Sequence, residues 1–169
     1  MITGDESMRR LGEIHVAAAR KHALRLCSFC TAVFPLEWDE QVVEDCTVQL
    51  LQFAFHARRI NDIGKIDCRI LQSVDHAASQ ISQNDPKNWE KRYDHALNAL
   101  HHSVSFTFGW VHTDHRQIFL ASDANKAPMY VKVKTDMFDE KTISIFGVAN
   151  CFLIEIISYL KSHQPDWRF

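Results

Sequence analysis

The sequence predicts a mainly α fold: an up-and-down bundle of about five helices, with one β-hairpin placed before the C-terminal helix. Two observations predict this class. Apolar residues recur at three- and four-residue spacings through most of the chain, as they do on the buried face of a helix. Glycine and proline are few, five and four in 169 residues, whereas a many-stranded sheet needs frequent turns. No linker divides the chain, so we expect residues 1–169 to form a single helical domain.

The first two helices are expected over residues 6–31 and from residue 39 to a break at Gly64. The first segment is rich in alanine, the best helix former. Pro35 ends this region, and Asp39 belongs to the residue types that cap a helix N-terminus. The second helix carries apolar residues at helical spacing: Val43, Cys46, Leu50, Phe53, Ala57 and Ile60.

A third helix is expected over residues 66–81, and a fourth from Pro86 to a point before Gly109. Asp85 would cap the fourth helix, and Pro86 would occupy its first position, where a missing N–H costs nothing. One face of this helix would carry its large apolar residues: Trp89, Tyr93, Ala96, Leu100 and Val104.

The β-hairpin is expected at about 116–134, with strands over 116–122 and 129–134. In the second strand Val131 and Val133 alternate with Lys132 and Lys134, which is the two-residue period of a half-exposed strand. A final helix is expected over 139–162. Because residues 143–160 are apolar around most of the helix, we expect a central core helix that also forms the interface of a homodimer, and not a membrane span.

Composition limits the cellular setting and the partners. The five cysteines, an odd number, all fall within expected helices, so we expect reduced thiols in a cytoplasmic protein. The first ten residues lack the apolar core of a signal peptide. A formal net charge of −2 does not favour non-specific attraction to nucleic acid, although a local basic patch remains compatible with it.

A dense polar group near the end of the second helix is the preferred binding site: His56, Arg58, Arg59, Asn61 and Asp62. Arginine can grip phosphate or carboxylate, and histidine can transfer a proton near neutral pH. A purely structural interpretation is also open. In it, Arg59 pairs with a carboxylate such as Asp62, and His56 binds a backbone carbonyl.

The thirteen residues 50–62, LLQFAFHARRIND, resemble the His-Ala-Arg segment of uncharacterised bacterial helical proteins of the HEPN class. The resemblance implies a helical bundle, often dimeric, of a kind found in ribonucleases, toxin–antitoxin modules and ligand-binding accessory domains. Arg69 and His76 loosely match the Arg-to-His spacing that marks HEPN ribonucleases, but Ile70 stands where that pattern has a polar residue. A ribonuclease would use Arg69 with His76, or His56 with Arg59.

A third hypothesis is a metal-dependent enzyme. Five of the ten histidines lie between residues 95 and 115, and neutral imidazole is a common ligand of zinc and iron. The candidate ligands are His95, His102, His112 and His115. No His-Glu-x-x-His pattern is present, and no cofactor is expected.

The leading functional hypothesis is a self-associating helical module that binds a partner protein, a small ligand or RNA through His56, Arg58 and Arg59. The HEPN-like ribonuclease and the metal-dependent enzyme are the alternatives. The sequence contains no phosphate-binding glycine loop and no nucleophile elbow, so it leaves open whether the protein is an enzyme.

Overall fold

The computed structural model describes residues 4–66, 88–113, 125–136 and 139–169. Its long helices are α1 (Gly4–Thr31) and α2 (Asp39–Gly64), and they pack against each other. The last helix is continuous through α5 (Ile145–Cys151), a π-helical segment η2 (Phe152–Ile156) and α6 (Ile157–His163). A shorter helix, α4 (Tyr93–His101), packs on α2. These elements make the described part of the chain mainly α, but with four helices instead of the five predicted.

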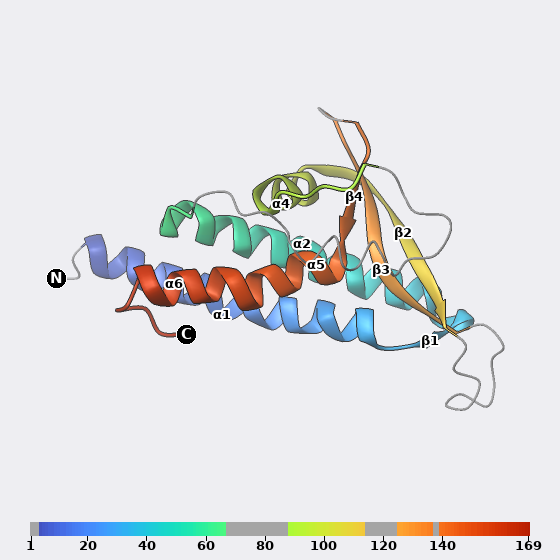
Figure 1. Cartoon of the computed structure of the whole chain (residues 1–169), viewed down its shortest axis with the longest axis horizontal. Helices are drawn as coiled ribbons and strands as arrows, with labels where there is room; N and C mark the ends of the chain where they lie inside the picture. The colour runs from blue at the N-terminus through green and yellow to red at the C-terminus, as the bar shows by residue number, and fades with distance from the viewer. Residues whose placement is uncertain (1–3, 67–87, 114–124, 137–138) are drawn as a thin grey trace.

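The three long helices lie side by side along the long axis, with α4 above them and the sheet at one end (Figure 1). Both chain termini lie at the opposite end from the sheet (Figure 1). Small residues let α1 and α2 approach closely, since Ala19 and Ala23 of α1 and Cys46 and Ala54 of α2 all belong to one buried cluster. Phe53 of α2 meets Phe152 of the last helix edge to face, with ring centroids 5.7 Å apart.

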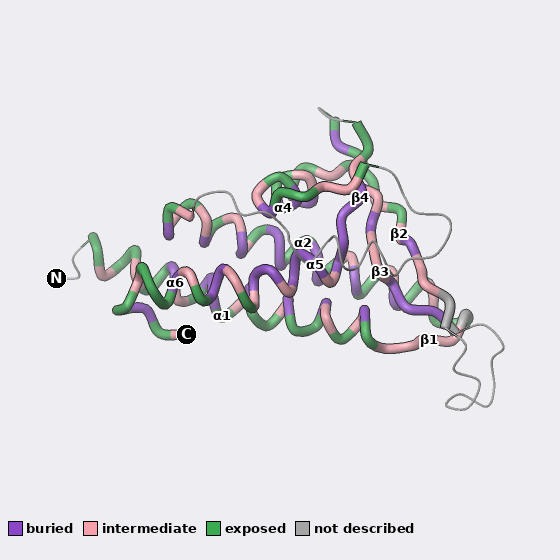
Figure 2. Tube along the Cα trace, in the orientation of Figure 1, coloured by how far each residue is buried: buried purple, intermediate pink, exposed green. Residues whose placement is uncertain are grey.

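The sheet is antiparallel and centred on β3 (Asn125–Thr135). β2 (Ser103–Thr113) pairs along one side of β3, and β1 (Phe34–Pro35) and β4 (Lys141–Ser144) pair along the other. Val131 and Val133 are fully buried, whereas Lys134 is exposed and Lys132 is half-buried. The predicted alternation of this strand is therefore confirmed. Figure 2 shows the buried stretches of β3 and β4 facing the helices.

The predicted first strand of the hairpin, residues 116–122, lies outside the described part of the chain. Within that part, β3 pairs with β2. The prediction of a helix reaching toward Gly109 was wrong, because α4 ends at His101 and the strand begins at Ser103. The same helix begins at Tyr93, and Trp89 instead forms an isolated β-bridge to Thr142.

The helix boundaries confirm some local signals and correct others. α2 ends at Gly64 as predicted, and Lys65 follows in the left-handed conformation with φ 48°. Asp39 does not cap α2, because Trp38 holds the N-cap position and Asp39 pairs with Lys126. The last helix was predicted from residue 139, yet residues Lys141–Ser144 form β4. The predicted third helix, 66–81, falls almost wholly outside the described residues.

The last helix is a core element. Among the described helices it is the one long and apolar enough to cross a membrane, over Ile145–His163, and half of that window is buried inside the fold. Its buried residues include Val148, Phe152, Ile156 and Leu160. This burial fits the core helix of a soluble protein. Of the large apolar side chains of this helix, only that of Ile154 is strongly exposed, at 60%.

Four cysteines in the described regions are free thiols: Cys27, Cys30, Cys46 and Cys151. Burial raises the pKa of the Cys46 thiol to about 12, and the nearby Asp45 carboxylate adds to the shift. Burial likewise raises the pKa of Cys30. These groups therefore stay protonated and act as small apolar residues of the core. Cys68 lies outside the described residues.

Candidate functional site

Imidazole rings from three helices meet on the outer side of α1, α2 and α4. We call this group the histidine cluster, and its members are His15, His22, Phe55, His56, Arg58, Arg59, His101 and His102. The sequence analysis selected His56, Arg58 and Arg59 for this role, and the structure adds the other residues around them.

Two contacts between α1 and α2 form the base of the cluster. The Nδ1 atoms of His15 and His56 are 2.8 Å apart, and His22 Nδ1 lies 2.7 Å from Gln49 Oε1. His15 and His22 are seven residues apart, as are Gln49 and His56, so each pair spans two helical turns. Because α1 and α2 run antiparallel, this spacing places both contacts on one side of the helix pair.

The contact between His15 and His56 fixes how their protons are arranged. For the two Nδ1 atoms to share a hydrogen bond, one ring must donate and the other must accept. When both rings are neutral, the donor ring has a free lone pair on Nε2, and the acceptor ring carries a hydrogen on Nε2. The pair therefore presents one basic nitrogen and one N–H, whichever ring donates.

Phe55 forms the exposed centre of the cluster. Its side chain is 43% exposed, and its ring meets the rings of His15 and His56 edge to face, at 6.0 and 5.1 Å between centroids. On its other side it stacks on His101 of α4 at 6.4 Å, with 29° between the ring planes. His101 in turn contacts His102.

Arginine supplies the charge of the cluster. The Arg58 guanidinium donates from Nη1 to His102 Nε2 at 2.9 Å, so His102 accepts as a neutral ring. Arg59 is exposed, and it pairs with no carboxylate in the described part of the chain. The structural alternative for Arg59, an ion pair with Asp62, is therefore not seen. His56 binds His15 and not a backbone carbonyl.

Three of the cluster histidines, His15, His56 and His101, have a lowered pKa and so favour the neutral form. Burial lowers the pKa of His15, and the Arg59 charge lowers it further. Burial, followed by His15 and His22, lowers the pKa of His56. Burial, followed by Arg58 and His102, lowers the pKa of His101. At neutral pH the cluster thus combines two fixed arginine charges with the uncharged rings of Phe55, His15, His56 and His101.

The remaining predicted site residues lie elsewhere. Asn61 belongs to the end of α2, where its backbone carbonyl accepts from Ile66, and Asp62 is exposed. His95 is exposed, with its ring nitrogens 3.9 Å from Glu90 and 3.8 Å from Asp94. Three further candidates, Arg69, His76 and His115, lie outside the described residues, as does the side chain of His112.

No metal centre is formed by the side chains that the structure describes. Across these ranges, no three His, Cys, Asp or Glu residues converge to hold an ion. His95 and His102 are two turns apart on α4 and have separate partners, Glu90 with Asp94 for the first and Arg58 for the second. The described residues therefore add no support to the metal hypothesis.

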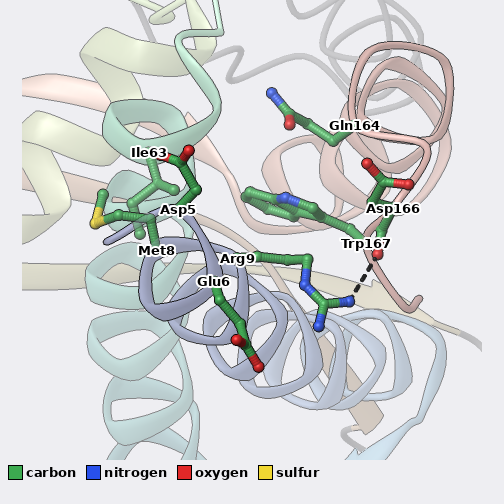
Figure 3. A pocket seen from close by; sticks show the side chains of 8 residues that line it. All are labelled: Asp5, Glu6, Met8, Arg9, Ile63, Gln164, Asp166 and Trp167. Atoms are coloured by element: carbon green, nitrogen blue, oxygen red, sulfur yellow. Dashed lines mark hydrogen bonds between the residues drawn. The ribbon is translucent and has the colours of Figure 1, made fainter. Parts of the chain in front are cut away.

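A cavity of about 600 Å³ lies away from the cluster, between the start of α1, the end of α2 and the C-terminal tail (Figure 3). It is lined by Asp5, Glu6, Met8, Arg9, Ile63, Gln164, Asp166 and Trp167. Figure 3 shows the Trp167 ring at its centre and Arg9 reaching the backbone carbonyl of Asp166, at 3.2 Å. This contact holds the tail against α1, so we assign the cavity a structural role in docking the tail.

No protein-family model, no curated protein and no solved structure matches the chain. The resemblance to the HEPN class consequently stays a prediction. The fold and the site define a helical protein with a small antiparallel sheet at one end and a histidine cluster across three of its helices.

Proposed function

We propose that the protein binds a nucleotide or single-stranded RNA at the histidine cluster. The observation that carries the proposal is the exposed ring of Phe55, which contacts three imidazole rings. Two arginines, Arg58 and Arg59, follow it one turn later on the same helix. Bases stack on exposed aromatic rings, and arginine binds phosphate oxygens. His101 and Phe55 already adopt a nearly parallel arrangement, which offers two ring faces for a base.

The charge of the cluster supports the phosphate part of the proposal. Arg58 and Arg59 contribute two cations, and in the described residues no carboxylate pairs with either arginine or with a cluster histidine. The whole chain has a formal net charge of −2, so binding depends on this local surface and not on a general electrostatic attraction of the protein for RNA. With two phosphate contacts, the logarithm of the binding constant should fall with the logarithm of the salt concentration at a shallow slope of about −1.4.

The test is fluorescence anisotropy with a labelled single-stranded oligoribonucleotide, and with unlabelled mononucleotides as competitors. Phe55→Ala should weaken RNA binding roughly tenfold, since stacking of one base is worth about 1–3 kcal/mol. Arg59→Ala should also weaken it and flatten the salt dependence. If mononucleotides compete fully, the ligand is a nucleotide; if only the oligonucleotide competes, it is RNA.

Matched controls separate the cluster from the rest of the surface. Trp38 is 56% exposed and lies outside the cluster, so Trp38→Ala removes an exposed aromatic ring without touching the site. Arg20→Ala removes an exposed arginine of α1. Both variants should bind RNA as the unmodified protein does. Equal losses in the controls and the cluster variants would contradict the proposal.

A ribonuclease is the second candidate, and the hydrogen bond between His15 and His56 favours it. The donor ring of this pair keeps a free lone pair on Nε2, which can act as the general base in cleavage of a phosphodiester, and the Arg59 guanidinium can bind the phosphate. We propose the pair of His15 and His56 as the base, with Arg59 as the phosphate-binding group. Intact RNA after prolonged incubation with the purified protein would exclude the ribonuclease while leaving the binding proposal in place.

We also propose a cytoplasmic location, for which the free buried thiols are the support. Self-association through the C-terminal helix stays a prediction. Most apolar side chains of that helix already belong to the core, and Ile154 would be the main exposed contact of such an interface. A partner protein is an equally untested expectation.

A further inference from the structure

The outward face of α2 carries an apolar stripe that the described residues of the chain leave exposed. Val48 is 48% exposed, Leu51 is 38% exposed and Phe55 is 43% exposed. The three residues follow one another at spacings of three and four along α2, so they form one line on the helix surface. Large apolar side chains lined up in solvent at this spacing are typical of a helix that packs against another helix.

Opposite charges mark the two ends of the stripe. Glu44 lies one turn before Val48, and Arg59 lies one turn after Phe55. Both side chains are exposed, and neither pairs with an oppositely charged group in the described part of the chain. Along about 22 Å of helix, the stripe therefore begins with an acidic residue, continues with three apolar residues and ends with a basic residue.

This order is complementary to itself in the antiparallel direction. When a second α2 is laid antiparallel with the two-fold axis beside Leu51, Glu44 faces Arg59 of the other copy. Val48 then faces Phe55 of the other copy, and the two Leu51 side chains meet at the axis. A parallel arrangement would instead place Glu44 against Glu44 and Arg59 against Arg59, which repel.

We propose that a second copy of this chain docks antiparallel on the stripe formed by Glu44, Val48, Leu51, Phe55 and Arg59. The surface is two-fold symmetric, so each copy contributes the same residues and the assembly closes as a dimer. The apolar centre excludes water, and the terminal ion pairs select the register. The contact is small, and association should accordingly depend on protein concentration.

The dimer and the proposed ligand share Phe55. A ring packed against Val48 of the second copy is not free to stack on a base, so the two events should compete. The dimer itself rests on the stripe and needs no ligand, and its test contains none. Failure of the dimer and failure of RNA binding are therefore distinguishable.

The test is sedimentation velocity over about 1–200 µM protein, at low and at high salt. The unmodified protein should shift from monomer to dimer with concentration. Leu51→Glu should weaken the dimer at least tenfold, because it places two carboxylates at the axis. The matched control is Leu24→Glu, which changes a leucine that is 52% exposed on α1 and away from the stripe, and it should leave the dimer intact.

Charge reversal tests the register. Glu44→Arg and Arg59→Glu should each weaken the dimer, and the double variant should restore it, since the pairs are then reversed and not removed. A monomer at every concentration would overturn the proposal. So would a dimer that survives Leu51→Glu, or single charge reversals that the double variant does not rescue; Ile154→Glu would then locate the interface on the C-terminal helix.

Discussion

Histidine protonation is the residue-level event that links this site to pH. His15, His56 and His101 have pKa values lowered from the ordinary value of about 6.5, chiefly by burial. The hydrogen bond between His15 and His56 also requires that one ring accept at Nδ1, and a fully protonated pair cannot form it. The folded protein therefore resists protonation at positions where the unfolded chain accepts it.

The sign of the resulting pH dependence follows. Above about pH 7.5 both states are neutral at these histidines, and they contribute no slope. Below about pH 7.5 the unfolded chain binds more protons than the folded one, so the free energy of unfolding falls as the pH falls, by at most about 1.4 kcal/mol per pH unit for each histidine. Urea unfolding at several pH values between 8 and 5 measures this slope. His56→Gln should reduce it, whereas His95→Gln, at an exposed position outside the cluster, is the control. An unchanged slope in His56→Gln would contradict the assignment.

A neighbouring aromatic ring explains why position 12 holds a glycine. A Cβ at this position would lie 2.3 Å from the Trp167 ring, which is packed on α1. Gly12→Ala should therefore destabilise the protein by about 1–3 kcal/mol through displacement of the ring, although alanine is the better helix former. In a Trp167→Ala background the same change should become stabilising by roughly 1 kcal/mol. Thermal unfolding of the four variants measures both effects, and an unchanged sign would show that the tail does not dock there.

At the scale of elements, Ser144 defines where the last helix begins. Its Oγ is buried and accepts a hydrogen bond from the Gly147 backbone N–H at 2.9 Å. Ser144→Ala removes this capping hydrogen bond, and the cost should be about 1–2 kcal/mol in chemical unfolding. Ser158→Ala is the matched control, since this exposed serine of the same helix bonds only the Ile154 carbonyl in its own helix. A loss in the control equal to that in Ser144→Ala would rule out a specific capping role.

Local signals in the sequence predicted the elements that depend on them. The alanine-rich segment gave α1, and the helical apolar spacing with Gly64 gave α2. The strand β2 was missed, although Val104, Phe106 and Phe108 alternate with Ser105 and Thr107. The spacing of Leu100 and Val104 fits a helix equally well, and only pairing with β3 decides for the strand. β4 was also missed, because its four residues, Lys141–Ser144, are too few to show a two-residue period and run directly into the apolar last helix.

Only the part of the site that lies on a single helix could be predicted from the sequence. His56, Arg58 and Arg59 are close in sequence, and the sequence analysis selected them. His15, His22 and His101 come from other helices and carry no motif of their own. Their only signal was the seven-residue spacing shared by His15 with His22 and by Gln49 with His56. Reading that signal requires knowing that α1 and α2 are antiparallel neighbours in this register, which is a property of the fold.

At the scale of the whole molecule, Lys126 joins the sheet to the bundle. It lies on β3, is 7% exposed, pairs with Asp39 at the start of α2, and places its ammonium 4.3 Å from the centroid of the Trp110 ring. The ends of the pair differ in exposure: the Lys126 side chain is 9% exposed and that of Asp39 is 32% exposed. Removing one partner therefore has a different consequence from removing the other.

Asp39→Ala should be the more damaging change, because it leaves a buried ammonium without its carboxylate, at a cost of about 3 kcal/mol. Lys126→Met keeps most of the buried aliphatic chain and leaves the Asp39 side chain, which is 32% exposed although its Oδ1 atom is buried, so its cost should be smaller, about 1–2 kcal/mol. The double variant should be more stable than Asp39→Ala alone, since it removes the stranded charge. Urea unfolding measures the free energy of unfolding of the two single variants and of the double variant. In Asp39→Ala, hydrogen exchange should show that β3 opens earlier than α1. Equal costs for the two single variants would mean that Lys126 reaches water in the folded protein and does not fasten the sheet to the bundle.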